Sequence, residues 1–567
     1  MSYGHIRDRI NWGPFALVIF TLYQAAIWIA WVIPSQYYVG FDEGWHLEVS
    51  QHLYYSLVDY GVLGLFWKFL HAMPAKPPLV SLLPVPFYLL LGNYTWVAAA
   101  VNLAWLLLLN VYLFRLVRHF WGDGPGLIAC VSLQTMPLFP GLSRMVMAEY
   151  GTAVLVVMFM YYLFTHPSST RRAIILGIIM GVGLLEKVLF PTYILGPLIC
   201  TIWAEIRNKE MENRQHAFAL WFLSFGIASI LAGPWYLINF RHLMGYTFQS
   251  TYGELAKVYR FGTTLKDINA LWTYLLEFIN IGVTAYQGIL LACVLIGSIV
   301  LGHNSFQKVS GPIKVGMVLW FLFPFLMYLP SLYRNFKFMM PFFTPMSIAL
   351  GVLLWRLLSL IHKKQWRWFA LSLLLLWPNL GILYASFPLG RINEPYHLFT
   401  VGPLELLPQR GYLGFPRLGR WPYEEILQFV ASDGACFRTN SGRNPSIGMV
   451  ADMSEFNRST MRYIQKRGRF RVEVYWAPVG GSSDPKYSLE NALKLASQQD
   501  YLVFRSVSPT EVDFTNRFND QIRQQIETGN LHFSPVKAFQ LPDGTEALVY
   551  RRIPVKDEDW NRRDGKN

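Results

Sequence analysis

Three acidic residues beside long apolar segments are the first candidates for chemistry in this sequence. Asp42 and Glu43 follow the first apolar segment in the stretch Phe-Asp-Glu-Gly-Trp-His, and Glu149 opens a later one. A carboxylate in such a place can act as a general base and take a proton from an acceptor nucleophile. The structural alternative for Asp42 and Glu43 is that they are two solvated acidic residues at the end of a helix. Because aspartate and glutamate have similar reference pKa values, the sequence does not rank Asp42 against Glu43.

Basic residues near the same apolar segments suit an anionic leaving group. Lys76 opens Lys-Pro-Pro-Leu, where two prolines fix the backbone, and Lys187 fills the short gap between two apolar segments. Arg334 and Lys337 lie in Tyr-Arg-Asn-Phe-Lys-Phe. Such cations can hold a phosphate and stabilise the charge that develops on it as it leaves. The alternative is an ordinary snorkelling or anchoring side chain. All four are predicted to bind a donor phosphate.

Three further side chains are predicted to line the substrate site: His46, Trp235 and Tyr236. The alternative for the two aromatic residues is the belt of tryptophan and tyrosine that membrane helices place among lipid headgroups. The four cysteines show no Cys-x-x-Cys spacing, and no cysteine or histidine pattern matches a zinc site. We therefore predict no metal and no other cofactor.

The composition indicates that a membrane protein carries these residues. Of 567 residues, 53% are hydrophobic and only 15% are charged, whereas soluble domains carry about 25% charged residues. Each span must be helical, because lipid cannot satisfy an open backbone. At roughly 20 residues per span the sequence predicts about eleven transmembrane helices, at 13–33, 95–117, 124–141, 149–166, 172–186, 188–205, 217–237, 283–302, 314–332, 338–358 and 368–388.

The basic residues of the short loops predict the orientation. With the N-terminus inside, every basic cluster between closely spaced helices falls on the inner side, as the positive-inside rule expects. An odd number of spans then places residues 390–567 outside the cell (inner) membrane, with two long loops at 34–94 and 238–282. Arg334 and Lys337 also fall outside, against that rule. In the first loop, 45–60 and 79–91 are predicted to be helices at the membrane interface.

The net charge of +14 has a simple source in this topology. Basic loops orient the helices and attract anionic lipid headgroups, and no basic stripe or recognition motif for nucleic acid is present. We therefore predict membrane lipid as a partner and no nucleic-acid binding.

The tail from residue 390 has the pattern of a soluble α/β domain. Helical patterns alternate with strand-like ones, as α/β domains require. No Gly-x-Gly-x-x-Gly motif or P-loop is present. The predicted helices are 422–432, 455–466, 487–498 and 511–528, and the predicted strands are 446–451, 470–475, 500–505 and 546–551.

Six short motifs, in order along residues 10–390, resemble those of the C-type membrane glycosyltransferases, in the group of the protein O-mannosyltransferases and the lipid A aminoarabinose transferase. They are the acidic pair at Asp42, the Lys76-Pro-Pro-Leu stretch, Glu149 at a helix start, Gly183-Leu-Leu-Glu-Lys187, Gly233-Pro-Trp-Tyr236, and the basic-aromatic stretch from Arg334 to Pro341. The sequence departs from the family pattern at Val188, where glycine is usual, and at Glu149, where many relatives have aspartate. The tail is not covered by the resemblance.

The resemblance implies a fold and an activity. The expected architecture is a polytopic all-α membrane domain of the C-type fold at 1–389 and an outer α/β domain at 390–567. The expected activity is inverting transfer of a sugar from a polyprenyl-phosphate carrier to an acceptor that is a protein, a lipid or a glycan, on the non-cytoplasmic face. Asp42 is the favoured base, with Lys76 and Lys187 as phosphate contacts. Two alternatives remain open: a transporter or flippase of lipid-linked sugars, and a membrane-anchored binding protein that works through its tail.

Overall fold

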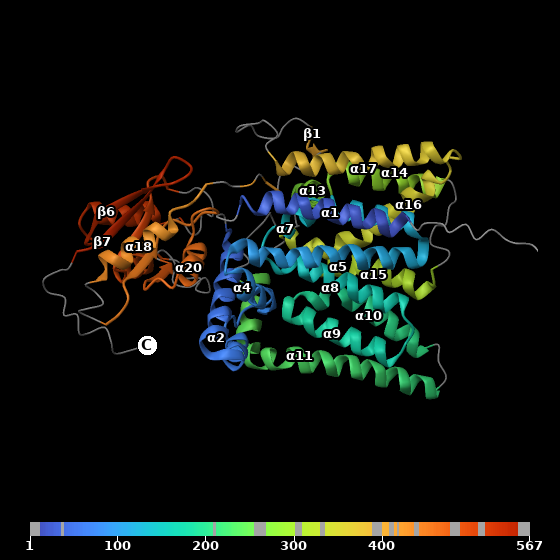
Figure 1. The fold of residues 1–567 in the computed structure, drawn as a ribbon, viewed down its shortest axis with the longest axis horizontal. Coiled ribbons are helices and arrows are strands. Elements are labelled where there is room, and N and C mark those ends of the chain that lie inside the picture. Colours follow the sequence, from blue (N-terminus) through green and yellow to red (C-terminus); the bar gives the residue numbers. More distant parts are fainter. Residues whose placement is uncertain are drawn as a thin grey trace, which may run out of the picture.

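A bundle of long helices carries a separate α/β domain at one end, with helix α2 between them (Figure 1). The computed structural model describes residues 12–35, 39–207, 211–253, 268–300, 309–328, 335–387, 400–406, 413–414, 416, 419–435, 442–476, 488–508, 516 and 518–553. Arg334, one of the predicted phosphate ligands, lies outside the described residues.

In the part of the chain that the structure describes, each of the eleven predicted apolar segments contains a helix, and the segment 124–141 contains two. Within the described residues, seven helices are long and apolar enough to cross a membrane, or eight if a pair bent by 97° is one span, so the predicted count of eleven is approximate. The bundle comprises α1 (Trp12–Val32), α5 (Thr95–Trp121), α6 (Asp123–Gln134), α7 (Leu138–Ser143), α8 (Ala148–Thr165), α9 (Thr170–Glu186), α10 (Phe190–Arg207), α11 (Met211–Thr251), α13 (Ile268–Glu277), the π-helix η1 (Phe278–Val283), α14 (Ala285–Val300), α15 (Gly311–Tyr328), the 3₁₀ helix η2 (Phe336–Phe342), α16 (Phe343–Leu358) and α17 (Lys364–Ser386).

Helix α8 is the most enclosed of the candidate membrane spans among the described residues. Its most apolar stretch is 78% buried, and it packs against α5, α9, α10 and η2. A helix that is apolar on every side belongs in the centre of a fold. Glu149 lies in the first turn of α8, so the fold places this carboxylate at the end of the central helix.

Helix α2 (Phe41–His71) crosses one end of the bundle, roughly perpendicular to the long helices (Figure 1). It is followed by α3 (Leu79–Leu82) and α4 (Val85–Leu91), which are separated by prolines. Both segments of the first loop that were predicted to be helical are therefore helical. Gly61 has a φ of +69° and breaks α2, a conformation that glycine adopts without steric cost.

The α/β domain is built on a five-stranded sheet of order β4-β3-β5-β7-β6. Strands β3 (Ser446–Met449), β4 (Glu473–Trp476) and β5 (Tyr501–Arg505) are parallel, and β6 (Phe533–Gln540) and β7 (Glu546–Arg552) complete it as an antiparallel hairpin. The helices are α18 (Tyr423–Asp433), α20 (Arg458–Arg467), α21 (Leu489–Ser497) and α23 (Asn519–Glu527). A short hairpin, β1 (Thr400–Val401) and β2 (Leu404–Glu405), precedes the domain. The sequence predicted every long element here except β6.

Candidate active site

Asp42 meets two lysines at the α2 end of the bundle. Its Oδ2 accepts a hydrogen bond from Lys337 Nζ at 2.5 Å, and its Oδ1 lies 3.5 Å from Lys76 Nζ. Asp42 comes from the first turn of α2, Lys76 from the turn before α3, and Lys337 from η2. The fold thus joins residues that are 295 positions apart in the chain.

The two ammonium groups set the electrostatics of Asp42. The charge of Lys337, and after it that of Lys76, holds the pKa of Asp42 well below its ordinary range. The Asp42 side chain is 40% exposed, while those of Lys76 and Lys337 are 25% and 8% exposed. A ligand can therefore reach the carboxylate and Lys76 from outside the protein.

A second ion pair lies beside the first. Lys187 Nζ donates to Glu149 Oε1 at 2.7 Å, and both side chains are buried. The ring of Phe338 lies 4.4 Å from Lys187 Nζ and 5.5 Å from Lys337 Nζ. An aromatic face attracts a cation, and more strongly where water is excluded. Phe338 therefore joins the two ion pairs into one cluster, which we call the lysine cluster: Asp42, Lys76, Glu149, Lys187 and Lys337.

The neighbouring carboxylate, Glu43, is turned away from the lysine cluster. Its Oε1 accepts a hydrogen bond from the Val146 backbone N–H at 2.8 Å, and its Oε2 accepts one from Gly40 N–H at 3.4 Å. The side chain is buried, and burial raises its pKa to about 7. Glu43 thus ties the start of α2 to the turn before α8, and the structure separates two acids that the sequence left unranked.

His46 lies one turn after Asp42 on α2 and is buried. Burial, followed by the charge of Lys76, lowers its pKa to about 3, so the imidazole is neutral at physiological pH. Asp42, Glu149 and Lys337 are also close enough to influence its charge. His46 is therefore close to the lysine cluster, and its role in the substrate site stays a prediction.

Trp235 and Tyr236 lie on α11 and pack away from the ion pairs. Trp235 is buried in an apolar cluster with Leu70 and Leu185. The Tyr236 hydroxyl donates to the Leu184 carbonyl at 3.0 Å. In this structure the two residues join α11 to the ends of α2 and α9. Among the described residues, the hydrogen bonds and ring contacts of Trp235 and Tyr236 do not include a member of the lysine cluster.

Comparison with known proteins gives one family match and several structural ones. Residues 75–232 match the model of the family described as dolichyl-phosphate-mannose-protein mannosyltransferase. The structure is similar to that of ArnT from Cupriavidus metallidurans bound to undecaprenyl phosphate, with a TM-score of 0.55, 13% identity, and coverage of 95% of this chain and 98% of that chain. No curated protein sequence matches the chain.

Two other membrane transferases share the architecture. The archaeal oligosaccharyltransferase AglB from Archaeoglobus fulgidus, in complex with an inhibitory peptide and a dolichol-phosphate, matches with a TM-score of 0.52 and 12% identity, over 97% of this chain and 75% of that chain. The arabinofuranosyltransferase AftD from Mycobacteria matches with a TM-score of 0.54 and 13% identity, over 97% of this chain and 42% of that chain. The chain has the glycosyltransferase C-type fold. The fold and family resemblance expected from the motifs is confirmed.

Three aromatic residues that contact the lysines of this site were not singled out from the sequence. Lys76 Nζ lies 4.4 Å from the ring centre of Trp45 and 6.0 Å from that of Tyr246, and Phe338 contacts two other lysines. Trp45 follows the acidic pair, and Phe338 directly follows Lys337. For Phe338, its position next to a predicted cation was the available signal, whereas the fold brings Trp45 and Tyr246 to Lys76.

Replacing Glu43 by glutamine is expected to remove a pH-dependent loss of stability. A carboxyl whose folded-state pKa is raised stabilises the fold fully below its unfolded pKa, and this contribution is lost as the pH rises toward the folded value. For Glu43 the window runs from the reference value of 4.5 to about 7, a difference of about 3 kcal/mol. Thermal unfolding in detergent at pH 5 and pH 8 measures it. A pH dependence equal in wild type and Glu43→Gln would contradict this.

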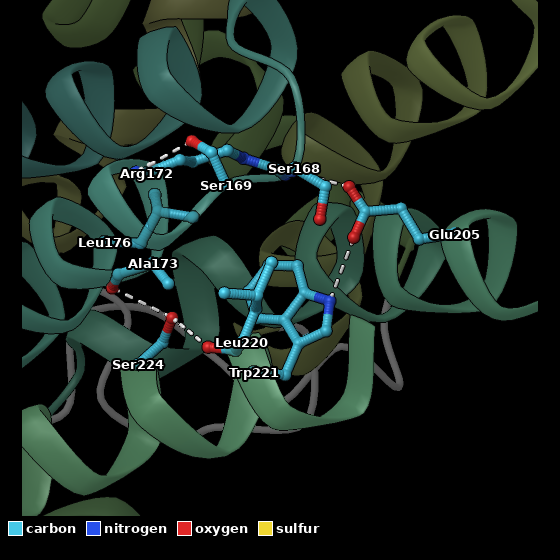
Figure 2. Close-up of a pocket in the computed structure, with 9 residues that line it drawn as sticks. All are labelled: Ser168, Ser169, Arg172, Ala173, Leu176, Glu205, Leu220, Trp221 and Ser224. Atoms are coloured by element: carbon cyan, nitrogen blue, oxygen red, sulfur yellow. Dashed lines mark hydrogen bonds and ion pairs between the residues drawn. The ribbon is translucent and has the colours of Figure 1, made fainter. Parts of the chain in front are cut away.

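A hollow at the opposite end of the C-type domain contains a different ion pair (Figure 2). Arg172, at the start of α9, donates to Glu205 Oε1 at 2.5 Å and to the Leu163 carbonyl at 3.2 Å. The Trp221 indole N–H donates to Glu205 Oε2 at 3.1 Å. These bonds join α9, α10 and α11. The ion pair in the hollow therefore holds helices together and is separate from the lysine cluster.

Replacing Glu205 by glutamine is expected to destabilise the bundle by about 3 kcal/mol, because it leaves the buried Arg172 charge without its counter-ion. The free energy of unfolding in detergent measures this. The matched control is Asp123→Asn, which weakens the more exposed pair Arg118–Asp123 (2.8 Å) and should cost less than about 1 kcal/mol. Equal losses in the two variants would contradict the expectation.

A metal is not indicated by the side chains that the structure describes. Within those ranges, no group of three or more histidine, cysteine, aspartate or glutamate residues is placed to hold a metal ion. Positive charge near Asp42 comes from Lys76 and Lys337.

Proposed function

We propose that this protein is an inverting glycosyltransferase that moves a sugar from a polyprenyl-phosphate carrier to an acceptor hydroxyl or amine. The observation that carries the proposal is the half-exposed Asp42 carboxylate between Lys76 and Lys337 at one end of the bundle. A base beside two cations matches the needs of a reaction with a nucleophile and a phosphate leaving group. The similar structures that contain undecaprenyl phosphate and dolichol-phosphate support a carrier of this class.

The proposed reaction is a single displacement. The acceptor atom attacks the anomeric carbon from the face opposite the phosphate, its proton passes to Asp42, and the bond between the anomeric carbon and the phosphate oxygen breaks. The bonding pair leaves on the polyprenyl phosphate, whose charge the lysines stabilise. One attack from the opposite face inverts the anomeric configuration. Holding base, nucleophile and leaving group together supplies much of the catalysis in such reactions.

Donor binding and base strength are coupled in this arrangement. Without a donor, Lys337 and Lys76 both neutralise Asp42 and make it a weak base. A donor phosphate offers the same ammonium groups a second anion, which draws charge away from Asp42 and raises its pKa. Asp42 thus becomes a stronger base when a donor is present. This order protects the site from unproductive proton transfer before the donor arrives.

The proposed orientation places the lysine cluster on the non-cytoplasmic side of the cell membrane. Helix α5 begins beside α4 and ends with Arg118 in its last turn, while Lys364 opens α17 and Arg171 lies in the first turn of α9. These basic residues lie at the end opposite α2. The positive-inside rule assigns that end to the cytoplasm, which leaves α2 and the α/β domain outside.

The test of the proposed function is sugar transfer by purified protein from a panel of radiolabelled polyprenyl-phosphate sugars to peptide, lipid and glycan acceptors. Turnover of one donor with inversion at the anomeric carbon is expected. Translocation of a lipid-linked sugar across proteoliposomes without transfer would support a flippase instead. Full acceptor binding by the isolated 390–567 segment, with no turnover of any donor, would support a membrane-anchored binding protein.

A further inference from the structure

Helix α20 of the α/β domain packs along α2, the helix that carries Asp42 (Figure 1). At the start of α2, the Thr460 hydroxyl donates to the Val39 carbonyl at 2.9 Å in a buried position. Farther along, Arg462 pairs with Glu48 at 2.5 Å, and the Tyr55 hydroxyl donates to the Arg467 carbonyl at 2.7 Å. These bonds follow α2 for several turns.

The two helices approach each other closely at Gly44. A Cβ at this position would lie 2.9 Å from the backbone carbonyl carbon of Ser459 and 2.9 Å from the backbone nitrogen of Thr460. Backbone atoms of a packed helix cannot rotate away as a side chain can, so any larger residue must separate α2 from α20. Gly44 stands two residues after Asp42 and one after Glu43.

The contacts with α20 lie on the side of α2 opposite Asp42. At 100° per residue, Gly44, Glu48 and Tyr55 fall within roughly 40° of one another around the helix axis. Asp42 is roughly 160° from Gly44 by the same geometry. One face of α2 therefore contacts α20 while the other presents Asp42 to Lys76 and Lys337.

We infer that the C-terminal domain positions the catalytic carboxylate: α20, packed on Gly44 and bonded to the start of α2, holds Asp42 within reach of Lys76 and Lys337. This inference rests on the function proposed above. It gives the domain a role in the reaction besides any contact with an acceptor. Thr460, more than 400 residues from Asp42, becomes a positioning residue, as does Gly44.

Releasing α2 from α20 is expected to lower the rate of sugar transfer, because it would move Asp42. A displacement of about 1 Å in a reacting group can reduce the rate by roughly 100-fold. Moving Asp42 away from the lysines also weakens the attraction that keeps its pKa low, so the pKa rises toward its ordinary value. The charged or titratable groups that face Asp42 are Lys76, Lys337 and His46, with Glu149 behind them.

The test compares wild type, Gly44→Ala and Thr460→Val as full-length proteins in nanodiscs, with kcat, KM and the pH dependence of kcat/KM as readouts. Each variant is expected to reduce kcat at least fivefold with little change in the acceptor KM, and to move the acid limb to higher pH. Thr460→Ser keeps the hydroxyl and should restore both. Gly226→Ala, at a helix position with open space around the missing Cβ, is the control for glycine replacement.

Each outcome decides the inference. Variants that keep the wild-type kcat and acid limb overturn it, and so do variants whose activity falls only in proportion to the folded fraction, with the acid limb unmoved. If Gly44→Ala does not fold, the Thr460→Val and Thr460→Ser pair decides alone. A wild type without turnover overturns the proposed function and this inference together, whereas an active wild type with unchanged variants overturns the inference only.

Discussion

Asp42→Asn is expected to lower the rate of sugar transfer by about 10²–10⁴-fold, the range for losing a general base. The asparagine amide has the same shape but cannot accept the acceptor's proton. It also removes the negative charge between Lys337 and Lys76, so donor binding should be retained or strengthened. A fall in kcat without a rise in the donor Kd is therefore the expected signature. Single-turnover kinetics and a separate donor-binding measurement check the two parts.

The adjacent acid provides the control for this prediction. Glu43 accepts hydrogen bonds from the backbone N–H groups of Val146 and Gly40. Glu43→Gln should therefore keep the kcat of the folded protein within about threefold of wild type, because only interactions made in the transition state change kcat. Full transfer by Asp42→Asn would remove Asp42 as the base. If Glu43→Gln instead abolished transfer in folded protein, the assignment of the two acids would be reversed.

The sequence was most informative about the membrane domain, because lipid leaves the backbone no choice except a helix. It was less informative where packing decides the outcome. Helix α2 was predicted at 45–60 but runs from Phe41 to His71, and α11 continues through Pro234 to Thr251. The segment 124–141 is broken after Gln134. Strand β6 was missed because it is an edge strand with an irregularity between Pro535 and Lys537 and only one buried residue, and pairing with β7 forms it.

The sequence predicted most of the residues of the candidate site, but it did not predict which of them contact one another. Lys337 was singled out because a cation on the outer side breaks the positive-inside rule, and the structure places it on Asp42. Asp42 and Glu43 could not be separated, because the difference between them is their direction around α2. The contact of Gly44 with Thr460 depends on two helices hundreds of residues apart, and no local pattern encodes it.

Lys76→Gln is expected to lower kcat/KM by about 10²–10³-fold, as the loss of one preorganised charge at a developing anion does. Lys76 is the more exposed of the two lysines on Asp42, and Trp45 holds it in place 4.4 Å away. It is therefore the cation that a donor phosphate meets first. Its charge also lowers the pKa of Asp42, so the variant should show an acid limb at higher pH than wild type. The pH dependence of kcat/KM measures both effects.

The pH shift separates this role from general loss of binding. A lysine that only attracted the lipid would change the donor Kd and leave the acid limb in place. Lys68→Gln removes another cation of α2 outside the lysine cluster and should change kcat/KM less than about twofold. Lys76→Arg keeps the charge, so it should retain the acid limb of wild type while losing part of the rate, because a planar guanidinium does not replace a compact ammonium. An unchanged acid limb in Lys76→Gln would show that Lys76 does not act on Asp42, and would leave Lys76 a part in donor binding alone.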